Sequence, residues 1–541
     1  MKKEITNPIL KGFNPDPSIA CVDGIFYIAT STFEWFPGVQ IHRSLDLIHW
    51  EAIGHVLDRT TQLDMKGVPD SCGVWAPCLS YDKGTFYLVY SNVRSFDGPW
   101  KDTPNYLVTS QSIKGPWSEP TYLNASGFDA SLFHDSNGKK WLTNMITDHR
   151  KNMLFGGIQL QEWDENNKAL IGKAYTIFEG TELGCTEGPH IYQRNGWYYL
   201  LTAEGGTDYD HCVTIARSKN ITGPYELHPN NPIITANQDS HAHFQRTGHA
   251  DLFETPQGEW YAVYLGSRPL MPAKRCTLGR ETLIEKIRWD NDWPYLTTAD
   301  KTTRTHVPAP DITPAPTIPT PKRETFELTS LAPSWQSLRI PVDESWLSLT
   351  ERPQHLRLKG RESLSSTHCQ SLIARRLQAF NIEAACQLEF KPKSFQQMAG
   401  LVCYYNTAHY LYFYASSCDT DPLLNKLSLV VVDNNIASEP IINNVTYAEE
   451  SPIYLKVKWH NEGVQFLYSH SKQANDWHKF GPILDGSILS DDYVRDGGNK
   501  YRAAFTGAFI GLNCQDLSGK NIPADFKWFS YQELESSAPT S

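Results

Sequence analysis

Short runs of alternating apolar and polar residues dominate the first 300 residues, whereas helical periodicity is scarce. Five of these runs share a glycine-bearing turn followed by an aromatic-rich strand: DGIFYIATS from Asp23, KGTFYLVYS from Lys83, NGKKWLTNM from Asn137, NGWYYLLTA from Asn195 and QGEWYAVYL from Gln257. A glycine turn followed by β-branched or aromatic residues is typical of a β-hairpin. The pattern therefore predicts five hairpins.

The five hairpins recur at a nearly constant spacing. Their aromatic markers lie 60, 54, 57 and 63 residues apart and are Tyr27, Tyr87, Trp141, Tyr198 and Tyr261. Five β units of about 57 residues predict a five-bladed β-propeller, in which four-stranded blades surround a central channel. A sandwich with coincidental hairpins is the alternative, and the regular spacing argues against it.

A second shared segment lies 11 or 12 residues before each marker. It reads Asp16-Pro-Ser-Ile, Trp75-Ala-Pro-Cys, Asp129-Ala-Ser-Leu, Glu187-Gly-Pro-His and His249-Ala-Asp-Leu. In a propeller the strand before this turn is the innermost one, so its start lies at one mouth of the channel. We therefore expect two aspartates, a glutamate, a histidine and a tryptophan to converge there.

Three carboxylates in one pocket repel one another, which separates their pKa values and suits acid–base chemistry. Taken singly, each acid would more often be a solvated turn residue, but the three share one register in three blades. Two carboxylates that flank a glycosidic bond can hydrolyse it, and a third can orient one of them. The pattern indicates a glycosidase.

At these positions the chain resembles glycoside hydrolase family 43, specifically its long two-domain β-xylosidases. The segments that carry the resemblance are KGFNPDPSI, STFEWFPGVQIHRSLDLIHW, VWAPCL, GFDASLF, NMITDHR, GCTEGPHIY, AEGGTDYDH, RTGHADL, LGRETL and FTGAFIGLNCQDLSG. The resemblance implies that Asp16 is the general base, Glu187 the general acid, and Asp129 the residue that orients the acid and raises its pKa. It also implies inversion, which requires carboxyl groups about 6.5–9.5 Å apart.

The resemblance implies further contacts to the sugar from Phe33, Trp75, Thr207 and Arg280. A surface ion pair with Glu281 or Glu285 is the alternative role for Arg280, and a structural role is the alternative for Thr207. The chain departs from the family pattern in two places. Thr147 stands where relatives often have an aromatic residue, and the stretch from Ser267 to Arg280 is short.

No cofactor is expected for the chemistry itself. For His249 the resemblance implies either contact with a hydrated calcium ion in the channel or a direct hydrogen bond to the pocket, and both interpretations stay open.

The second half of the chain begins after a proline-rich stretch. Six prolines in VPAPDITPAPTIPTP indicate an extended linker. Strand-like runs without helical patterns follow, including GLVCYYN, HYLYFYAS and IYLKVKWH, and predict a concanavalin-like β-sandwich. We expect a catalytic propeller over 1–306, a linker over 307–323 and a sandwich over 324–541.

The sandwich is either a carbohydrate-binding module or a wall of the active site. The resemblance implies that a phenylalanine of this domain reaches the sugar. FTGAF offers Phe505 and Phe509, of which we favour Phe509; packing in the sandwich core is the alternative.

Charge and composition exclude several other functions. The 541 residues contain 49 Lys and Arg against 60 Asp and Glu, a net charge of −11, so nucleic-acid and anionic membrane partners are not expected. No apolar stretch approaches about 18 residues, and the N-terminus lacks the apolar region of a signal peptide. Eleven cysteines without a C-x-x-C pair indicate reduced thiols. We expect a cytoplasmic homo-oligomer, either a dimer or a tetramer.

We therefore predict an inverting, exo-acting glycosidase that releases D-xylose from the non-reducing ends of β-1,4-xylooligosaccharides, with side activity on α-L-arabinofuranosides. One alternative is an enzyme that is mainly an α-L-arabinofuranosidase. A sugar-binding propeller without catalysis is the non-enzymatic alternative, and it is disfavoured because all three acids are present.

Overall fold

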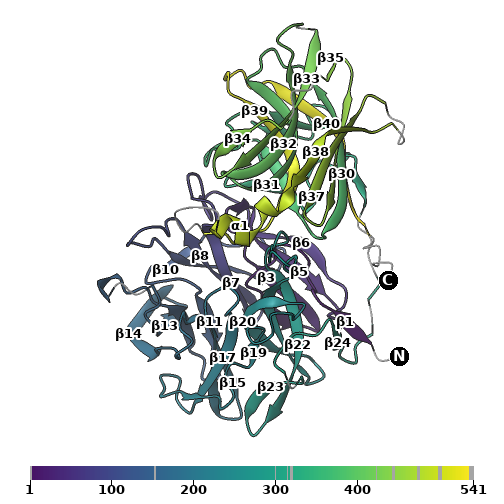
Figure 1. The fold of residues 1–541 in the computed structure, drawn as a ribbon. Helices are drawn as coiled ribbons and strands as arrows, with labels where there is room; N and C mark the ends of the chain where they lie inside the picture. The colour runs from purple at the N-terminus through teal and green to yellow at the C-terminus, as the bar shows by residue number, and fades with distance from the viewer. Residues whose placement is uncertain are drawn as a thin grey trace. The chain divides into compact units, whose positions relative to one another are not determined.

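The computed structural model describes residues 3–151, 154–298, 300–313, 315–316, 321–421, 423–440, 445–471, 476–496 and 503–534 (Figure 1). β-strands make up nearly all of the regular structure of these residues, which includes one short α-helix, α1 (Asp491–Asp496). They form two compact units. The first contains Met1–Arg268 and Arg280–Ile318, and the second contains Pro269–Gly279 and Pro319–Ser541.

The first unit is built from five antiparallel sheets. The first blade contains β2 (Ser18–Val22), β3 (Ile25–Thr30), β5 (Gly38–Ser44) and β6 (Glu51–Leu57), and the second contains β7 (Gly73–Asp82), β8 (Thr85–Val93), β9 (Asn105–Ser110) and β10 (Thr121–Asn124). The third contains β11 (Ser131–His134), β12 (Lys140–Met145), β13 (Ile158–Asp164) and β14 (Ala169–Phe178). The fourth contains β15 (Glu187–Arg194), β16 (Trp197–Glu204), β17 (Cys212–Ser218) and β18 (Glu226–Leu227), with β19 (Ile234–Thr235) beside β17. The fifth contains β20 (Gln245–Glu254), β21 (Trp260–Ser267), β22 (Glu281–Asp290) and β23 (Trp293–Leu296).

The innermost strands close a ring. β2 contacts β7, β7 contacts β11, β11 contacts β15, β15 contacts β20, and β20 contacts β2 again. Near the N-terminus, β1 (Glu4–Thr6) pairs with β24 (His306–Pro308), which joins the two ends of the unit. The arrangement confirms the predicted five-bladed β-propeller.

The predicted hairpin turns connect the first and second strand of each blade. In three of them both central residues have positive φ, as type I′ turns require: Asp23 and Gly24, Lys83 and Gly84, and Asn195 and Gly196. Apolar side chains of neighbouring blades pack together. Ile28 of the first blade and Val263 of the fifth, both fully buried, belong to one cluster.

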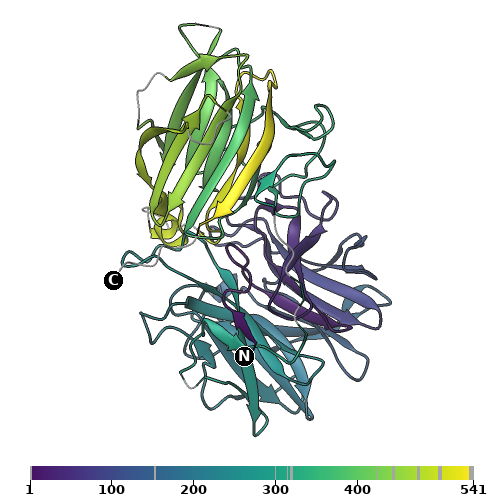
Figure 2. The same cartoon turned by 90° about the vertical axis from the view of Figure 1, so that its right-hand side faces the viewer.

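The second unit is a sandwich of two antiparallel sheets (Figure 2). One sheet has the order β27 (Leu347–Ser348), β28 (Leu356–Lys359), β40 (Pro523–Glu533), β30 (Asn381–Phe390), β36 (Ile453–His460), β37 (Gly463–Ser469) and β38 (His478–Asp485), with β25 (Arg323–Glu324) beside β40. The other includes β34 (Ile436–Ser438), β33 (Leu424–Asp433), β32 (His409–Ser417), β31 (Gln397–Asn406), β39 (Phe509–Asp516), β29 (Leu372–Arg376) and β26 (Gln336–Leu338), with β35 (Thr446–Ala448) beside β33.

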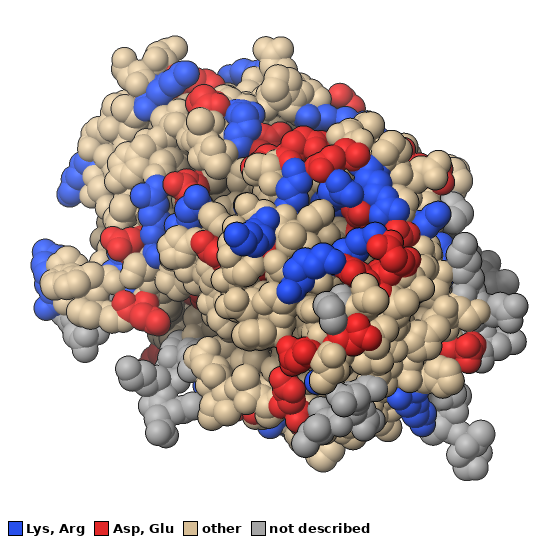
Figure 3. Space-filling view, turned by 90° about the horizontal axis from the view of Figure 1, so that it is seen from above, with Lys and Arg blue, Asp and Glu red and all other residues tan. Residues whose placement is uncertain are grey.

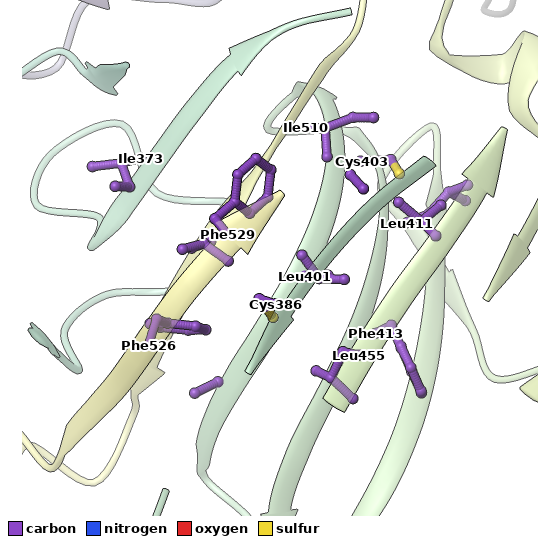
Figure 4. Close-up of a cluster of buried hydrophobic side chains, with 14 of the residues drawn as sticks. Ile373, Cys386, Leu401, Cys403, Leu411, Phe413, Leu455, Ile510, Phe526 and Phe529 are labelled. Carbon is purple, nitrogen blue, oxygen red and sulfur yellow. The ribbon is translucent and has the colours of Figure 1, made fainter. Parts of the chain in front are cut away.

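Alternate residues of these strands form one core between the sheets (Figure 4). Cys386, Leu455 and Phe526 come from one sheet, and Leu401, Leu411, Phe413 and Ile510 come from the other; all are fully buried. Burial of apolar area on this scale stabilises a domain without covalent cross-links. All eleven cysteines are free thiols. The predicted β-sandwich is confirmed.

Residues 269–279, just before Arg280, group with the second unit. The Cys276 amide donates to a carboxylate oxygen of Asp492 at 2.8 Å. The Ala508 amide donates to the carbonyl of Thr277 at 2.8 Å. Gly507 lies so close that an added Cβ would be 2.5 Å from the amide nitrogen of Gly279. This stretch is therefore anchored to the sandwich along its last residues.

The predicted linker begins at the edge of the propeller. Residues 306–308 form β24, and the Ala315 amide donates to Asp46 Oδ2 at 2.8 Å. Pro314 and residues 317–320 lie outside the described residues.

Charges of both signs lie interspersed on the face shown in Figure 3. Among the described residues, no helix has the length and apolar character needed to span a bilayer.

Candidate active site

Every blade has a residue with left-handed backbone in the first half of its innermost strand or just before that strand. These are Asp16 (φ 52°), Ala76 (φ 37°), Asp129 (φ 55°), Gly188 (φ 56°) and His249 (φ 49°). Strand register also shifts between Trp75 and Cys78, between Glu187 and His190, and around His249. Positive φ is uncommon for residues other than glycine and concentrates at functional sites. The repeat thus redirects the chain at one point in each blade.

Asp16 is buried and held by two donors. Ser31 Oγ donates to Asp16 Oδ2 at 2.6 Å, and Arg280 Nη1 lies 3.2 Å from Asp16 Oδ1. The same guanidinium nitrogen donates to Thr207 Oγ1 at 3.0 Å. Arg280 is itself only 4% exposed, so this is a buried charge pair rather than a surface one. Asp16, Arg280 and Thr207 therefore form one hydrogen-bonded group.

Asp129 lies next to the same ring nitrogen of His249 as Asp16. Its Oδ2 accepts from the Gly188 amide at 3.1 Å. His249 Nδ1 is 3.9 Å from both Asp16 Oδ1 and Asp129 Oδ2. Gly188 allows this packing, because an added Cβ would lie 3.0 Å from the imidazole ring of His249. Two acids from different blades thus share one histidine neighbour.

Glu187 completes the group of acids. Desolvation, the charge of Asp129 and the charge of Asp16 together raise the pKa of Glu187 well above its ordinary value. Burial and the charge of Asp16 also raise the pKa of Asp129, whereas the Gly188 amide and Arg280 oppose that rise. Like charges that are buried together favour retention of a proton. The pair of Asp129 and Glu187 therefore suits a proton donor at neutral pH.

His249 is neutral in these surroundings. Burial lowers the pKa of His249 to about 4, although the carboxylate of Asp16 opposes this effect. His249 therefore meets Asp16 and Asp129 as a neutral polar ring and not as a cation.

An aromatic wall adjoins the acids. The ring centroids of Phe33 and Trp75 are 5.8 Å apart, and the guanidinium carbon of Arg280 is 5.4 Å from the centre of the Phe33 ring. Trp75 also contacts Phe96 at 4.9 Å and Phe128 at 5.3 Å. Flat aromatic faces beside carboxylates are suited to packing against a sugar ring.

The first unit thus brings together eight of the nine predicted site residues: Asp16, Phe33, Trp75, Asp129, Glu187, Thr207, His249 and Arg280. Phe509 belongs to the second unit, at the start of β39. It is fully buried, but the sandwich core takes Ile510 and Leu512 from this strand instead. The Arg376 guanidinium lies 6.0 Å from the centre of the Phe509 ring.

Two contributors were not predicted from the sequence. Ser31 fixes Asp16, and its hydroxyl also accepts from the Ala76 amide at 2.7 Å. A serine after a strand carries no distinctive signal. Gly188 positions Asp129 and His249, and its place beside Glu187 in the repeated segment was the available signal.

Within the described residues, no group of three or more His, Cys, Asp or Glu side chains is arranged to hold a metal ion. Calcium prefers six to eight oxygen ligands.

A five-bladed propeller with three acids at one mouth, one of them suited to hold a proton, has the apparatus for cleaving glycosidic bonds. The fold and site define a glycosidase.

Comparison with known proteins gives the family. Residues 5–294 match Glycosyl hydrolases family 43, and residues 323–532 match the Beta xylosidase C-terminal Concanavalin A-like domain. The chain belongs to glycosyl hydrolase family 43.

Its relatives match along nearly the whole chain. The chain is 49% identical to a beta-xylosidase of Bacillus subtilis (strain 168), over 98% of this chain and 100% of the relative. It is 45% identical to xylosidase/arabinosidase 43B of Humicola insolens, over 98% of each chain. A crystal structure of xylan beta-1,4-xylosidase from Bacillus halodurans C-125 superposes with a TM-score of 0.94 at 48% identity, covering 98% of this chain and all of that one.

Proposed function

We propose that this glycosidase releases D-xylose from the non-reducing ends of β-1,4-xylooligosaccharides with inversion of configuration. The observation that carries the proposal is the arrangement of Asp129 and Glu187, with raised pKa values, beside an Asp16 that is held by Arg280 and Ser31; Asp16 and Asp129 both lie next to Nδ1 of His249. The names of the relatives support xylose as the sugar.

In this proposal Asp16 is the general base. Ser31 and Arg280 each occupy one of its carboxylate oxygens, which fixes the side chain while lone pairs stay available. A water held by Asp16 loses its proton as it attacks the anomeric carbon, and the carboxylate receives that proton.

Glu187 is the general acid, which gives its proton to the departing glycosidic oxygen. Asp129 is a positioning residue, whose charge contributes to the raised pKa of Glu187 and whose side chain is fixed by the Gly188 amide. A raised pKa keeps the acid protonated at the pH where the base is ionised.

The remaining predicted residues hold the sugar. Phe33 and Trp75 would pack against its ring, and Arg280 and Thr207 would donate to its hydroxyls. We extend the proposal to Phe509, whose burial outside the sandwich core supports a role other than core packing.

Exo action is supported by a plug beneath the acids. Asp251 Oδ2 accepts from Ser18 Oγ and from the Ile19 amide, each at 2.9 Å, and Asp251 Oδ1 accepts from the hydroxyl of Tyr192 at 2.6 Å. These residues come from three innermost strands, β2, β15 and β20, and their hydrogen bonds link those strands close to the acids. A sugar chain that enters at the mouth would therefore end at the plug, which favours cleavage of a terminal residue.

Proton NMR during early turnover of xylobiose tests the proposal. Inversion should yield α-xylose before mutarotation, because water attacks opposite the leaving group. Initial β-xylose would reject the mechanism, and absence of xylose would reject the substrate.

The second candidate is an enzyme that acts mainly on α-L-arabinofuranosides, which the name of the Humicola insolens relative favours. Nitrophenyl β-D-xyloside and α-L-arabinofuranoside separate the two candidates. We expect a higher kcat/KM for the xyloside and measurable activity on the arabinofuranoside.

Three further properties complete the proposal. Eleven free thiols support a reducing compartment, which is consistent with the cytoplasm. We propose a dimer or tetramer, which sedimentation will test. The chemistry needs no metal, and a hydrated calcium ion beside His249 would act only through its waters; activity should survive chelation.

A further inference from the structure

The end of β16 carries a buried acid that the proposed mechanism does not use. Glu204 is 0% exposed and occupies the last position of that strand. Its neighbour Ala203 is paired with Glu187 across the fourth blade. A carboxylate is costly to bury unless hydrogen-bond donors surround it. The donors around Glu204 therefore show which part of the chain it holds.

Three donors from one short segment surround the Glu204 carboxylate. The Thr181 amide donates to Oε1 at 2.8 Å, and the Thr181 hydroxyl donates to Oε2. The Thr186 hydroxyl donates to Oε1 at 2.8 Å. Hydrogen bonds to an ionised acceptor are stronger than those between neutral groups. Glu204 thus ties both ends of the segment 181–186 to the end of β16.

The segment 181–186 leads directly into Glu187 and is tightly packed against its anchor. Gly180, at φ 92°, lies at the base of the segment. A Cβ added to Gly180 would be 2.0 Å from Thr186 Oγ1 and 3.3 Å from Glu204 Oε1. Little space is therefore left for the segment to shift while Glu204 holds it.

The raised pKa of Glu187 has other sources. Burial and the charges of Asp129 and Asp16 raise it. Glu204 instead bonds to Thr186, the residue directly before Glu187. Proton transfer depends steeply on how the reacting atoms are placed, and a displacement of about 1 Å can cost about a hundredfold in rate. The contacts of Glu204 are therefore suited to placing the acid.

We propose that Glu204 is a positioning residue for the general acid. It fixes Thr181 and Thr186 and thereby sets where the carboxyl of Glu187 meets the departing glycosidic oxygen. This inference rests on the proposed function, because it takes Glu187 as the proton donor.

The test compares kcat/KM on xylobiose with kcat/KM on nitrophenyl β-D-xyloside in Glu204→Ala and in Thr186→Val. Xylobiose needs the proton of Glu187, whereas nitrophenolate departs without it. We expect the ratio of the two values, xylobiose over nitrophenyl xyloside, to fall by about ten- to hundredfold in Glu204→Ala. Thr186→Val removes one hydrogen bond, so the ratio should fall by roughly three- to tenfold.

Two buried side chains elsewhere in the propeller provide matched controls. Glu285→Ala removes another carboxylate that is 0% exposed, one that binds Arg304 in the fifth blade. Thr214→Val removes a hydroxyl that shares a hydrogen bond of 2.7 Å with Thr202 inside the fourth blade. A smaller folded fraction lowers turnover of both substrates alike. Each control should therefore keep the wild-type ratio, even where it lowers the melting temperature.

Glu204→Gln separates placement from charge. Its amide oxygen can still accept from the Thr181 amide and the Thr186 hydroxyl, and its amino group can donate to the Thr181 hydroxyl. The variant should therefore keep most of the wild-type ratio and the wild-type alkaline limb. Loss of a negative charge that acts on Glu187 would lower the pKa of Glu187 and move that limb to lower pH. Such a shift would overturn the positioning role.

An unchanged ratio in Thr186→Val, or in a folded Glu204→Ala, would also overturn this role. Thr186→Val decides by itself where Glu204→Ala does not fold, because it removes a single hydroxyl. Glu187→Gln shows separately whether the proposed function holds. Equal losses on both substrates in that variant would remove Glu187 as the acid and the inference with it. A selective loss there, with an unchanged ratio in Thr186→Val, would reject the positioning role alone.

Discussion

At the scale of single residues, Asp16 and Glu187 differ in the groups that surround their carboxyls. Asp16 has a cation and a hydroxyl on its two oxygens, whereas the surroundings of Glu187 favour its protonated form. In the proposed mechanism this difference separates a base from an acid within one pocket, as paired carboxylates in glycosidases require.

Asp16→Asn should reduce kcat/KM on xylobiose by about 10²–10⁴-fold, the usual contribution of a general base. The amide is isosteric and still accepts from Ser31 through its oxygen, so the melting temperature should change little. Steady-state kinetics and a thermal melt check this. Near-normal turnover would reject Asp16 as the base.

Glu187→Gln should harm xylobiose far more than nitrophenyl xyloside, because nitrophenolate departs without protonation. The pH dependence follows from the raised pKa of Glu187. The acid works while protonated, so wild-type activity on xylobiose should persist above the ordinary carboxyl range and be lost as pH rises through that raised pKa. The variant should lack this alkaline limb when assayed with nitrophenyl xyloside. Equal losses on both substrates would count against Glu187.

At the scale of elements, the start of each innermost strand decides which side chains meet. Gly188 shows how little space this region leaves. It has a φ of 56°, and a Cβ added to it would lie 3.0 Å from the His249 ring. Gly196 has a similar backbone, at φ 71°, but nothing within 4 Å of an added Cβ.

Gly188→Ala should lower kcat/KM by at least about tenfold, because the new methyl displaces His249 and disturbs the hydrogen bond to Asp129. The left-handed backbone adds roughly 1–2 kcal/mol of strain. Gly196→Ala is the control, with the same strain and unchanged kinetics. Denaturant titration and xylobiose kinetics measure both effects, and equal kinetic losses in the two variants would contradict the site role.

The repeated innermost strand also explains which site residues could be predicted from the sequence. The regular hairpin spacing aligned Asp16, Asp129, Glu187 and His249, because every blade repeats one backbone path. Ser31 escaped prediction, since its contact with Asp16 depends on how β3 ends rather than on a motif. The grouping of residues 269–279 with the sandwich could not be predicted from the local sequence either, because it depends on contacts with residues more than 200 positions away.

At the scale of the whole molecule, we expect the sandwich to contribute to activity. Phe509→Ala should lower kcat/KM on xylobiose by more than any loss of stability explains, since Phe509 is buried outside the sandwich core. Phe413→Ala is the comparison, because Phe413 lies in that core and its loss should cost about 3–5 kcal/mol. A Phe509 variant that is equally unstable and kinetically normal would assign this side chain to packing.

The path of the chain around residue 279 has a consequence for how such proteins can be recombined. Residues 269–279 pack with a domain encoded later, and Arg280, the partner of Asp16, follows at once. A gene cut at the proline-rich linker would retain this stretch but remove Asp492, Gly507 and Ala508, its packing partners. The propeller is therefore not a cassette that can be exchanged between enzymes by itself. The arginine that holds Asp16 and the sandwich have to be inherited together.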